Sequence, residues 1–155
     1  MSETVVNKLQ ITDNFDEMMS GELLYTIDSK GRMSFPQCFR DVIGDKFKIT
    51  KGVGSRLVAR SIENWNQLVR RIYALPEGKN KEILNQRFVK CAATVETDKL
   101  GRILIPQALR EHAKLVKDIY VVGAMDAVEI WDKSEYIKSQ DVSDEEIYAA
   151  TKDLG

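Results

Sequence analysis

The stretch Thr26–Asp41 has the sequence TIDSKGRMSFPQCFRD, and it recurs without a gap as ETDKLGRILIPQALRE at Glu96–Glu111. Every matched position is separated by 70 residues, and apolar positions of one copy fall on apolar positions of the other. The identical pairs are Asp28/Asp98, Gly31/Gly101, Arg32/Arg102, Pro36/Pro106, Gln37/Gln107 and Arg40/Arg110. Such a repeat indicates an internal duplication, so we expect a fold of two related halves.

Each copy predicts the same succession of short elements. A strand rich in β-branched and aromatic residues, at 23–27 and again at 95–97, leads into an Asp-x-x-Gly turn. A return strand follows at 32–35 and at 102–105, and the proline after it fits the first turn of a short helix. In the second copy Ile103–Ile105 is apolar throughout, which predicts burial on both faces. Two further strands complete each half, so the chain is predicted to be α+β and rich in β structure.

The turn is the part of each copy with the clearest chemistry. An aspartate side chain accepts hydrogen bonds from backbone N–H groups a few residues further on, and glycine adopts a positive φ without steric cost. The residues predicted to form the turns are Asp28 and Gly31 in the first copy and Asp98 and Gly101 in the second. We interpret both aspartates as turn formers and not as ligands.

A helical insert joins the two copies at about 61–93. Ser61 fits the N-cap of a first helix, and a second helix is predicted at about 80–92. The two are expected to form a hairpin packed on a barrel of strands. The predicted organisation is a flexible N-terminal extension at 1–17, a first half at 18–76, a second half at 77–138 and a C-terminal helix or tail at 139–155.

The composition is that of a globular protein. Apolar residues make up 43% and charged residues 30% of the 155 residues, which excludes a disordered chain of low hydrophobicity. No apolar run approaches the roughly 20 residues of a transmembrane helix, and the N-terminus does not resemble a signal peptide. Cys38 and Cys91 form no Cys-x-x-Cys motif, and His112 is the one histidine. We therefore expect a cytoplasmic protein without metal, cofactor or membrane partner, in which both cysteines are buried.

Charge is balanced over the whole chain but not along it. The formal net charge is −1, yet residues 21–134 hold 20 basic against 14 acidic residues. Residues 1–20 and 135–155 have net charges of −3 and −4. A basic body with acidic ends is compatible with a nucleic-acid partner, and equally with an ordinary surface of mixed charge.

The two motifs resemble the paired motifs of the MraZ family. The strings are YTIDSKGRMSFP at Tyr25–Pro36 and ETDKLGRILIP at Glu96–Pro106, each with an Asp-x-x-x-Arg signature. Gly21-Glu22 before the first motif and VEIWD at 128–132 after the second also resemble this family. The resemblance extends over residues 18–138. Two motif copies joined by a helical insert are far more specific than a single copy.

The resemblance implies both a fold and a function. Each half is similar to one half-domain of the AbrB and MazE type, which implies a pseudo-symmetric, duplicated β-barrel with swapped hairpins. The family resemblance further implies a transcriptional regulator that binds double-stranded DNA at short direct repeats in the promoter of the division and cell-wall gene cluster. It implies a homo-oligomeric ring, association with the nucleoid, no enzymatic activity and no small-molecule ligand. Leu100 stands where the first copy has Lys30, so the lysine of the second copy, Lys99, occupies a different position in its turn.

On this interpretation the turns carry the DNA-binding residues. The four cations are Lys30 and Arg32 in the first copy and Lys99 and Arg102 in the second. An arginine fork binds phosphate or guanine bidentately, whereas lysine is a point charge suited to phosphate. Arg40 and Arg110, which lie on the short helices, are expected to be solvated or paired with the turn aspartates.

Two other classes of function stay open at this point. Asp28 and Asp98 are related by the repeat and would be the acids of a two-carboxylate enzyme, although an aspartate followed by Gly and Arg is typical of an exposed turn. The acidic segment 143–155 would be the binding segment of an antitoxin-like module that wraps a protein partner. The sequence favours DNA binding over both.

Overall fold

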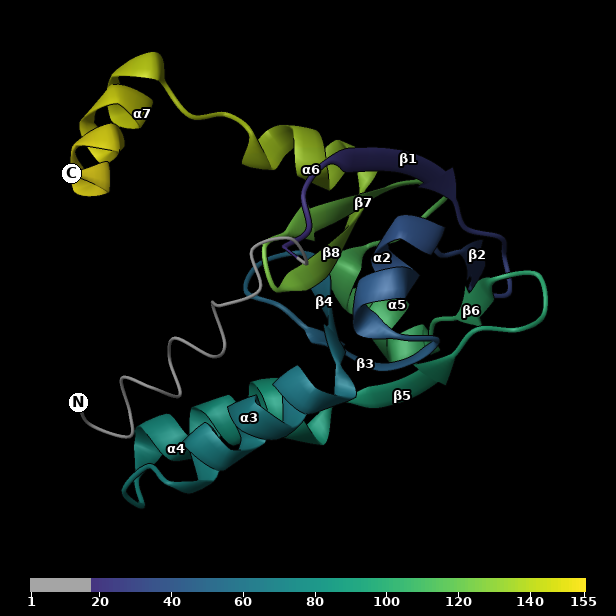
Figure 1. Cartoon of the computed structure of the whole chain (residues 1–155), viewed down its shortest axis with the longest axis horizontal. Helices are drawn as coiled ribbons and strands as arrows, with labels where there is room; N and C mark the ends of the chain where they lie inside the picture. Colours follow the sequence, from purple (N-terminus) through teal and green to yellow (C-terminus); the bar gives the residue numbers. More distant parts are fainter. Residues whose placement is uncertain (1–17) are drawn as a thin grey trace.

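Figure 1 shows the computed structural model, which describes residues 18–155. The predicted extension at 1–17 lies outside the described residues. The strands are β1 (Glu22–Thr26), β2 (Arg32–Ser34), β3 (Lys46–Lys51), β4 (Arg56–Ser61), β5 (Ala93–Glu96), β6 (Arg102–Leu104), β7 (Asp118–Ala124) and β8 (Ala127–Asp132). The helices are α2 (Gln37–Ile43), α3 (Ile62–Tyr73), α4 (Lys79–Leu84), the π-helix η2 (Asn85–Lys90), α5 (Gln107–Ala113), α6 (Lys133–Ser139), α7 (Asp144–Thr151) and the 3-10 turn η3 (Lys152–Leu154). The predicted α+β, β-rich class is confirmed.

Strands of the two repeats are interleaved in one antiparallel sheet. Its order is β1-β7-β8-β4-β3-β5, and β2 pairs with β6 in a separate two-stranded ribbon. Within a repeat, β3 pairs with β4 and β7 with β8. All other pairs, namely β1–β7, β3–β5, β4–β8 and β2–β6, join one repeat to the other. Because β1–β7 and β5–β3 are equivalent under the repeat, the duplicated and pseudo-symmetric fold is confirmed.

The order of elements by itself suggested that each return strand forms a hairpin with the strand before it. The return strands are exchanged between the repeats instead, in agreement with the swapped hairpins that the family resemblance implied. One isolated bridge, Ile27 to Met33, connects β2 to the strand before it. The ribbon pairs Arg32 with Leu104, Met33 with Ile103 and Ser34 with Arg102. This exchange brings Met33 and Ile103 together at the centre of the molecule, where both are buried. Burial of these apolar side chains favours the exchanged pairing.

The core lies between the curved sheet and the helices α2 and α5 (Figure 1). Phe35 and Phe47 pack with ring centroids 4.7 Å apart. Phe39 of α2 and Leu109 of α5 occupy equivalent positions in the two repeats, and both are buried in the same cluster. Each repeat therefore completes the core of the other.

Two predictions of burial are wrong. Leu104 is 55% exposed, because the ribbon has one face in solvent and successive side chains of a strand point to opposite faces. Cys38 is exposed on α2, and Cys91 is half-buried where its thiol donates to the Arg87 carbonyl oxygen at 2.7 Å. The apolar run at 103–105 thus has one buried face, with Ile103 and Ile105, and one exposed face, with Leu104.

The helical insert forms a hairpin that projects from the sheet (Figure 1). Ser61 caps α3, since its side chain accepts a hydrogen bond from the Asn64 N–H at 3.1 Å. Trp65 and Ile72 bury the inner face of α3, whereas neither α4 nor η2 has a buried residue. The predicted hairpin forms, and α3 and η2 contact β3 and β4, whereas its tip projects away from the sheet. No helix between residues 18 and 155 is long and apolar enough to cross a membrane.

Candidate nucleic-acid interface

Two turns of the same construction project from one end of the molecule. Asp28 accepts hydrogen bonds through Oδ1 from the backbone N–H groups of Lys30 and Arg32, each at 2.9 Å. Asp98 accepts from Leu100 and Arg102 at the same distances. The glycines adopt φ values of 91° at Gly31 and 76° at Gly101. In Figure 1 the ribbon β2–β6 and its turns lie at the end of the molecule remote from α7 and the helical hairpin.

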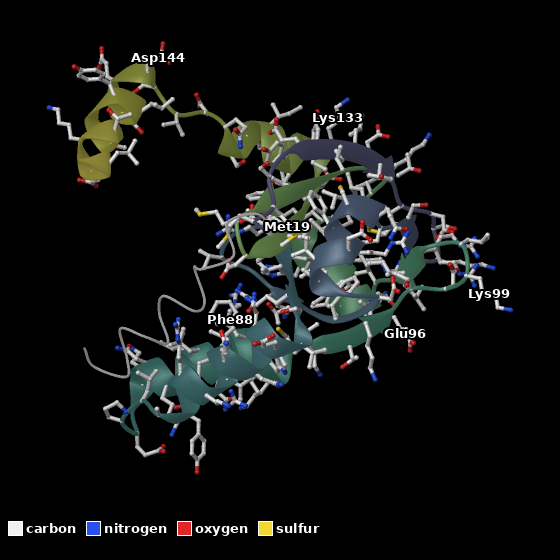
Figure 2. The ribbon with its side chains drawn as sticks, viewed as in Figure 1. Met19, Phe88, Glu96, Lys99, Lys133 and Asp144 are labelled. Carbon is white, nitrogen blue, oxygen red and sulfur yellow. The ribbon has the colours of Figure 1, made fainter. Side chains whose placement is uncertain are left out.

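The ribbon presents one face to solvent, and three of its four outward side chains are polar. Alternation along the strands turns Met33 and Ile103 inward, so that the outer face carries Arg32, Ser34, Arg102 and Leu104. In this register Arg32 and Arg102 are diagonal neighbours, which places their Cα atoms about 7–8 Å apart. Lys99 lies at the edge of the molecule in Figure 2, and both Lys99 and Lys30 are exposed. The four predicted cations therefore gather on one end, where Asp28 and Asp98 are the acids of the turns.

The two turns differ in how their arginines are held. The Arg102 Nε donates to Asp98 Oδ2 at 2.9 Å, in an ion pair whose side chains are each 43% exposed. Arg32 is exposed and forms no ion pair with any residue in 18–155. Leu100, which replaces the lysine of the first turn, is 73% exposed. The first turn thus offers a free guanidinium beside a lysine, and the second offers a tethered guanidinium beside a leucine.

Each turn is supported by the other repeat. The backbone N–H of Ile105 donates to the Gly31 carbonyl at 2.8 Å, and Arg110 packs against Gly31, where a Cβ would meet its Nε at 2.7 Å. On the other side, a Cβ on Gly101 would meet the Arg40 guanidinium at 2.8 Å. The side-chain donors of Arg110 reach the carbonyl oxygens of Ile105 at 2.9 Å and Ser29 at 3.4 Å. We call this arrangement, of Arg40 on Gly101 and Arg110 on Gly31, the crossed clasp.

The crossed clasp corrects the expected role of Arg40 and Arg110. Neither forms an ion pair with a turn aspartate, because Arg40 pairs with Asp45 at 3.3 Å and both guanidiniums donate to backbone carbonyls. The signal was present in the sequence, since glycine and arginine recur together at the same spacing in both copies. Its meaning depended on the strand exchange, which brings the arginine of one copy to the glycine of the other.

Both turn aspartates are held in the charged form. The backbone N–H of Arg32 is the main cause that lowers the pKa of Asp28 below its ordinary value, and the Arg102 N–H does the same for Asp98. Each carboxylate is used by its own turn and faces solvent. The open cavity beside the first turn is lined by neither of them, since its lining is Ser29, Gln107, Arg110, Glu111, Lys114, Leu115 and Val116. The geometry therefore does not favour a two-carboxylate active site.

No group of three or more His, Cys, Asp or Glu side chains that could hold a metal ion occurs in residues 18–155. His112, the one histidine, lies on α5, and its Nε2 is buried without a hydrogen-bond partner. Burial is the main cause that lowers the pKa of this imidazole. Its surroundings are those of a packed side chain and not of a metal ligand.

The fold and the turns define a class of protein in which a duplicated sheet of exchanged strands presents two related cationic turns at one end. A family model described as "MraZ protein, putative antitoxin-like" matches the chain twice, at residues 18–88 and 88–154. The chain belongs to the MraZ family.

Three curated relatives, each named "Transcriptional regulator MraZ", match most of the chain. The relative from Caldanaerobacter subterraneus subsp. tengcongensis is 44% identical over 134 residues, which cover 84% of this chain and 94% of the relative. The relative from Acetivibrio thermocellus is 45% identical over 120 residues, covering 77% and 84%. The relative from Thermoanaerobacter sp. (strain X514) is 42% identical over 141 residues, covering 88% and 99%. These names describe regulators and not enzymes, in agreement with the prediction that the chain is not an enzyme.

Proposed function

We propose that this chain is a sequence-specific regulator of transcription that binds double-stranded DNA with its two turns. The observation that carries the proposal is the Arg32 guanidinium, which is exposed, unpaired within residues 18–155 and placed beside Lys30 on a turn fixed by hydrogen bonds. A two-stranded ribbon fits the major groove of DNA, where an arginine fork binds the O6 and N7 atoms of guanine. The names of the relatives support this proposal.

The two turns are assigned different tasks. Arg32 is free to read a base edge, whereas Arg102 is held by Asp98 and suits a fixed contact to phosphate. Lys30 and Lys99 supply point charges for the DNA backbone. These are few phosphate contacts for one copy, so a single chain binds weakly and with a strong dependence on salt.

Assembly into a ring compensates for this weakness. Several copies on one DNA raise the apparent affinity through effective concentration. A head-to-tail ring presents the same turns repeatedly in one sense, which suits direct repeats better than a palindrome. In keeping with the family resemblance, we assign the target to direct repeats in the promoter of the division and cell-wall gene cluster, and the site of action to the nucleoid in the cytoplasm.

The test is a titration of DNA that carries these promoter repeats, with a shuffled duplex of the same composition for comparison. Arg32→Ala is expected to lower affinity for the repeats about 10- to 100-fold, the usual cost of a lost bidentate base contact. Arg102→Ala should cost less, because its guanidinium is already engaged with Asp98. The matched control is Lys90→Ala, which removes one exposed charge on η2 and should change affinity little.

The effect of salt separates base contacts from phosphate contacts. Lys30→Ala should weaken both duplexes alike and reduce the slope of log affinity against log salt by about one. A folded Arg32→Ala chain that binds the repeats with unchanged affinity would show that the turns are not the DNA-binding surface.

A further inference from the structure

The helix α7 has no packing partner within the chain. None of its residues is buried, and Figure 1 shows it set apart from the sheet and from the helical hairpin. Ile147, Tyr148 and Leu154 leave 51%, 73% and 85% of their surfaces exposed. A helix of eight residues is too short to be stable in water by itself, and these exposed apolar side chains are available to a partner. The helix therefore lacks the surface that would stabilise it.

The segment is acidic as well as apolar. Residues 141–155 hold five acidic residues against Lys152, a net charge of −4. Asp144, Glu145 and Glu146 form the first turn of α7. Such a segment is repelled by DNA phosphates and by anionic lipid headgroups. Its partner is therefore a protein surface that combines positive charge with an exposed apolar anchor.

The tip of the helical hairpin, residues 70–81, has this chemistry. Four basic residues stand there against Glu77, for a net charge of +3. Tyr73 is 80% exposed, and the Lys81 ammonium lies 5.1 Å from the centre of its ring. Tyr73 and Tyr148 are the two exposed aromatic side chains among residues 18–155. One therefore lies on the hairpin tip and the other on α7, and tyrosine is enriched in protein interfaces.

We propose that α7 of one copy docks on the hairpin tip of a second copy. Tyr148 packs against Tyr73, and the acidic first turn of α7 faces Arg70 and Arg71, both of which are exposed. Figure 1 places α7 and the hairpin tip at separate points of the periphery, so each copy offers one surface to each of two neighbours. Such a contact is head-to-tail and generates a ring when the rotation closes. The inference rests on the proposed function only because it assigns a contact between neighbouring copies in the ring proposed there.

The size of the surfaces sets how the assembly should behave. A segment as short as 144–154 buries less than the roughly 1,600 Å² of a standard interface, so a single pair of copies is held weakly. Closure of a ring strengthens each contact through the others. We therefore expect the assembly to dissociate on dilution. In high salt, which screens the charges, dissociation should begin at a higher chain concentration.

The experiment measures the mass of the full-length chain by light scattering over a range of concentrations. Tyr148→Asp should shift the midpoint of assembly at least about tenfold toward higher concentration, as expected for a buried aromatic anchor. Glu145→Arg with Glu146→Arg should do the same, as should Arg70→Glu with Arg71→Glu. Mixing these two charge-reversed chains should restore large species. The control Glu96→Arg changes an exposed carboxylate on β5 and should leave the mass unchanged.

Three outcomes would overturn the proposal. The first is a wild-type chain that is monomeric at every concentration, and the second is a mass unaffected by Tyr148→Asp. The third is a mixture of the two charge-reversed chains that forms no large species, which would place α7 on another surface or on another protein. Gel retardation of a single-repeat duplex by the same variants keeps this test separate from the proposed function. The Tyr148→Asp chain should still bind the single-repeat duplex. If the wild-type chain assembles as expected but does not bind this duplex, the result contradicts DNA binding and not the docking of α7.

Discussion

Replacing Gly31 with alanine should be among the most damaging single changes in this fold. A Cβ at this position would lie 2.7 Å from the carbonyl oxygen of Ile105 and 2.7 Å from the Nε of Arg110. The backbone φ is 91°, which strains any L side chain. The carbonyl oxygen is backbone and cannot rotate away, so either the Ile105 to Gly31 hydrogen bond must open or the arginine must leave the crossed clasp.

The expected loss in free energy of unfolding can be estimated by comparison with Gly54 and Gly101, which differ in the steric contacts that an added Cβ would make. Gly54 has a φ of 77° and nothing within 4 Å of its Cβ position, so Gly54→Ala should cost only the backbone strain of about 1–2 kcal/mol. Gly101→Ala adds a contact with the Arg40 guanidinium, which is the far end of a flexible side chain, for about 2 kcal/mol in all. Gly31→Ala adds a backbone clash and a stretched hydrogen bond, for about 3–4 kcal/mol.

Urea unfolding followed by tryptophan fluorescence measures the three free energies of unfolding. Chain concentration is held fixed, because assembly stabilises the folded state by mass action. The expected order of loss is Gly31→Ala, then Gly101→Ala, then Gly54→Ala. If Gly31→Ala costs no more than Gly54→Ala, the clasp around the first turn does not constrain it, and the interpretation of Arg110 as its support is wrong.

Two further predictions concern the turns and the core. The pKa of Asp28 and of Asp98 lies below the ordinary 3.8 because backbone N–H groups donate to the carboxylates, so each turn is fully stabilised above pH 3.8 and loses this stabilisation as pH falls through the lowered pKa. NMR titration of the carboxyl carbons, together with the Arg32 and Arg102 amides, should give matching midpoints below 3.8, and a midpoint at or above 3.8 would refute it. Phe47→Ala should destabilise the fold by about 3–5 kcal/mol in urea unfolding, because the side chain is fully buried against Phe35. A loss below about 1 kcal/mol would mean that the core closes around the gap.

The type and order of the elements could be predicted from the sequence because they depend on local patterns. Proline before each short helix, alternation in the return strands and the Ser61 cap all act within a few residues. Strand partners could not be predicted from these patterns, since the same alternation satisfies a local hairpin and an exchanged one. Leu104 shows the consequence: an apolar run suggested two buried faces, whereas pairing with β2 leaves one face in solvent.

The candidate site, too, could be predicted from the sequence only in its local features. The turn residues and the two arginines follow from the repeated motif itself, and the two lysines from their places inside the turns. The tether of Arg102 to Asp98 and the freedom of Arg32 do not, because both turns contain the same Asp-x-x-Gly-Arg pattern and the pattern does not specify the rotamer of its arginine. The support of the turns was also out of reach, since Arg40 lies 61 residues before Gly101 and Arg110 lies 79 residues after Gly31.

The exchange of strands gives the duplication a physical meaning. Because each turn rests on an arginine and a backbone N–H donor of the other repeat, a change of side chain at one tip leaves the support of both turns intact. Leu100 can therefore replace a lysine at the tip of the second turn while Arg110 still holds the first. A pair of unlike turns on one ribbon also has a direction, which two identical turns related by exact symmetry would lack. On the proposed function, that direction is what allows one chain to bind an asymmetric repeat in a single orientation, and successive copies to bind direct repeats in the same sense.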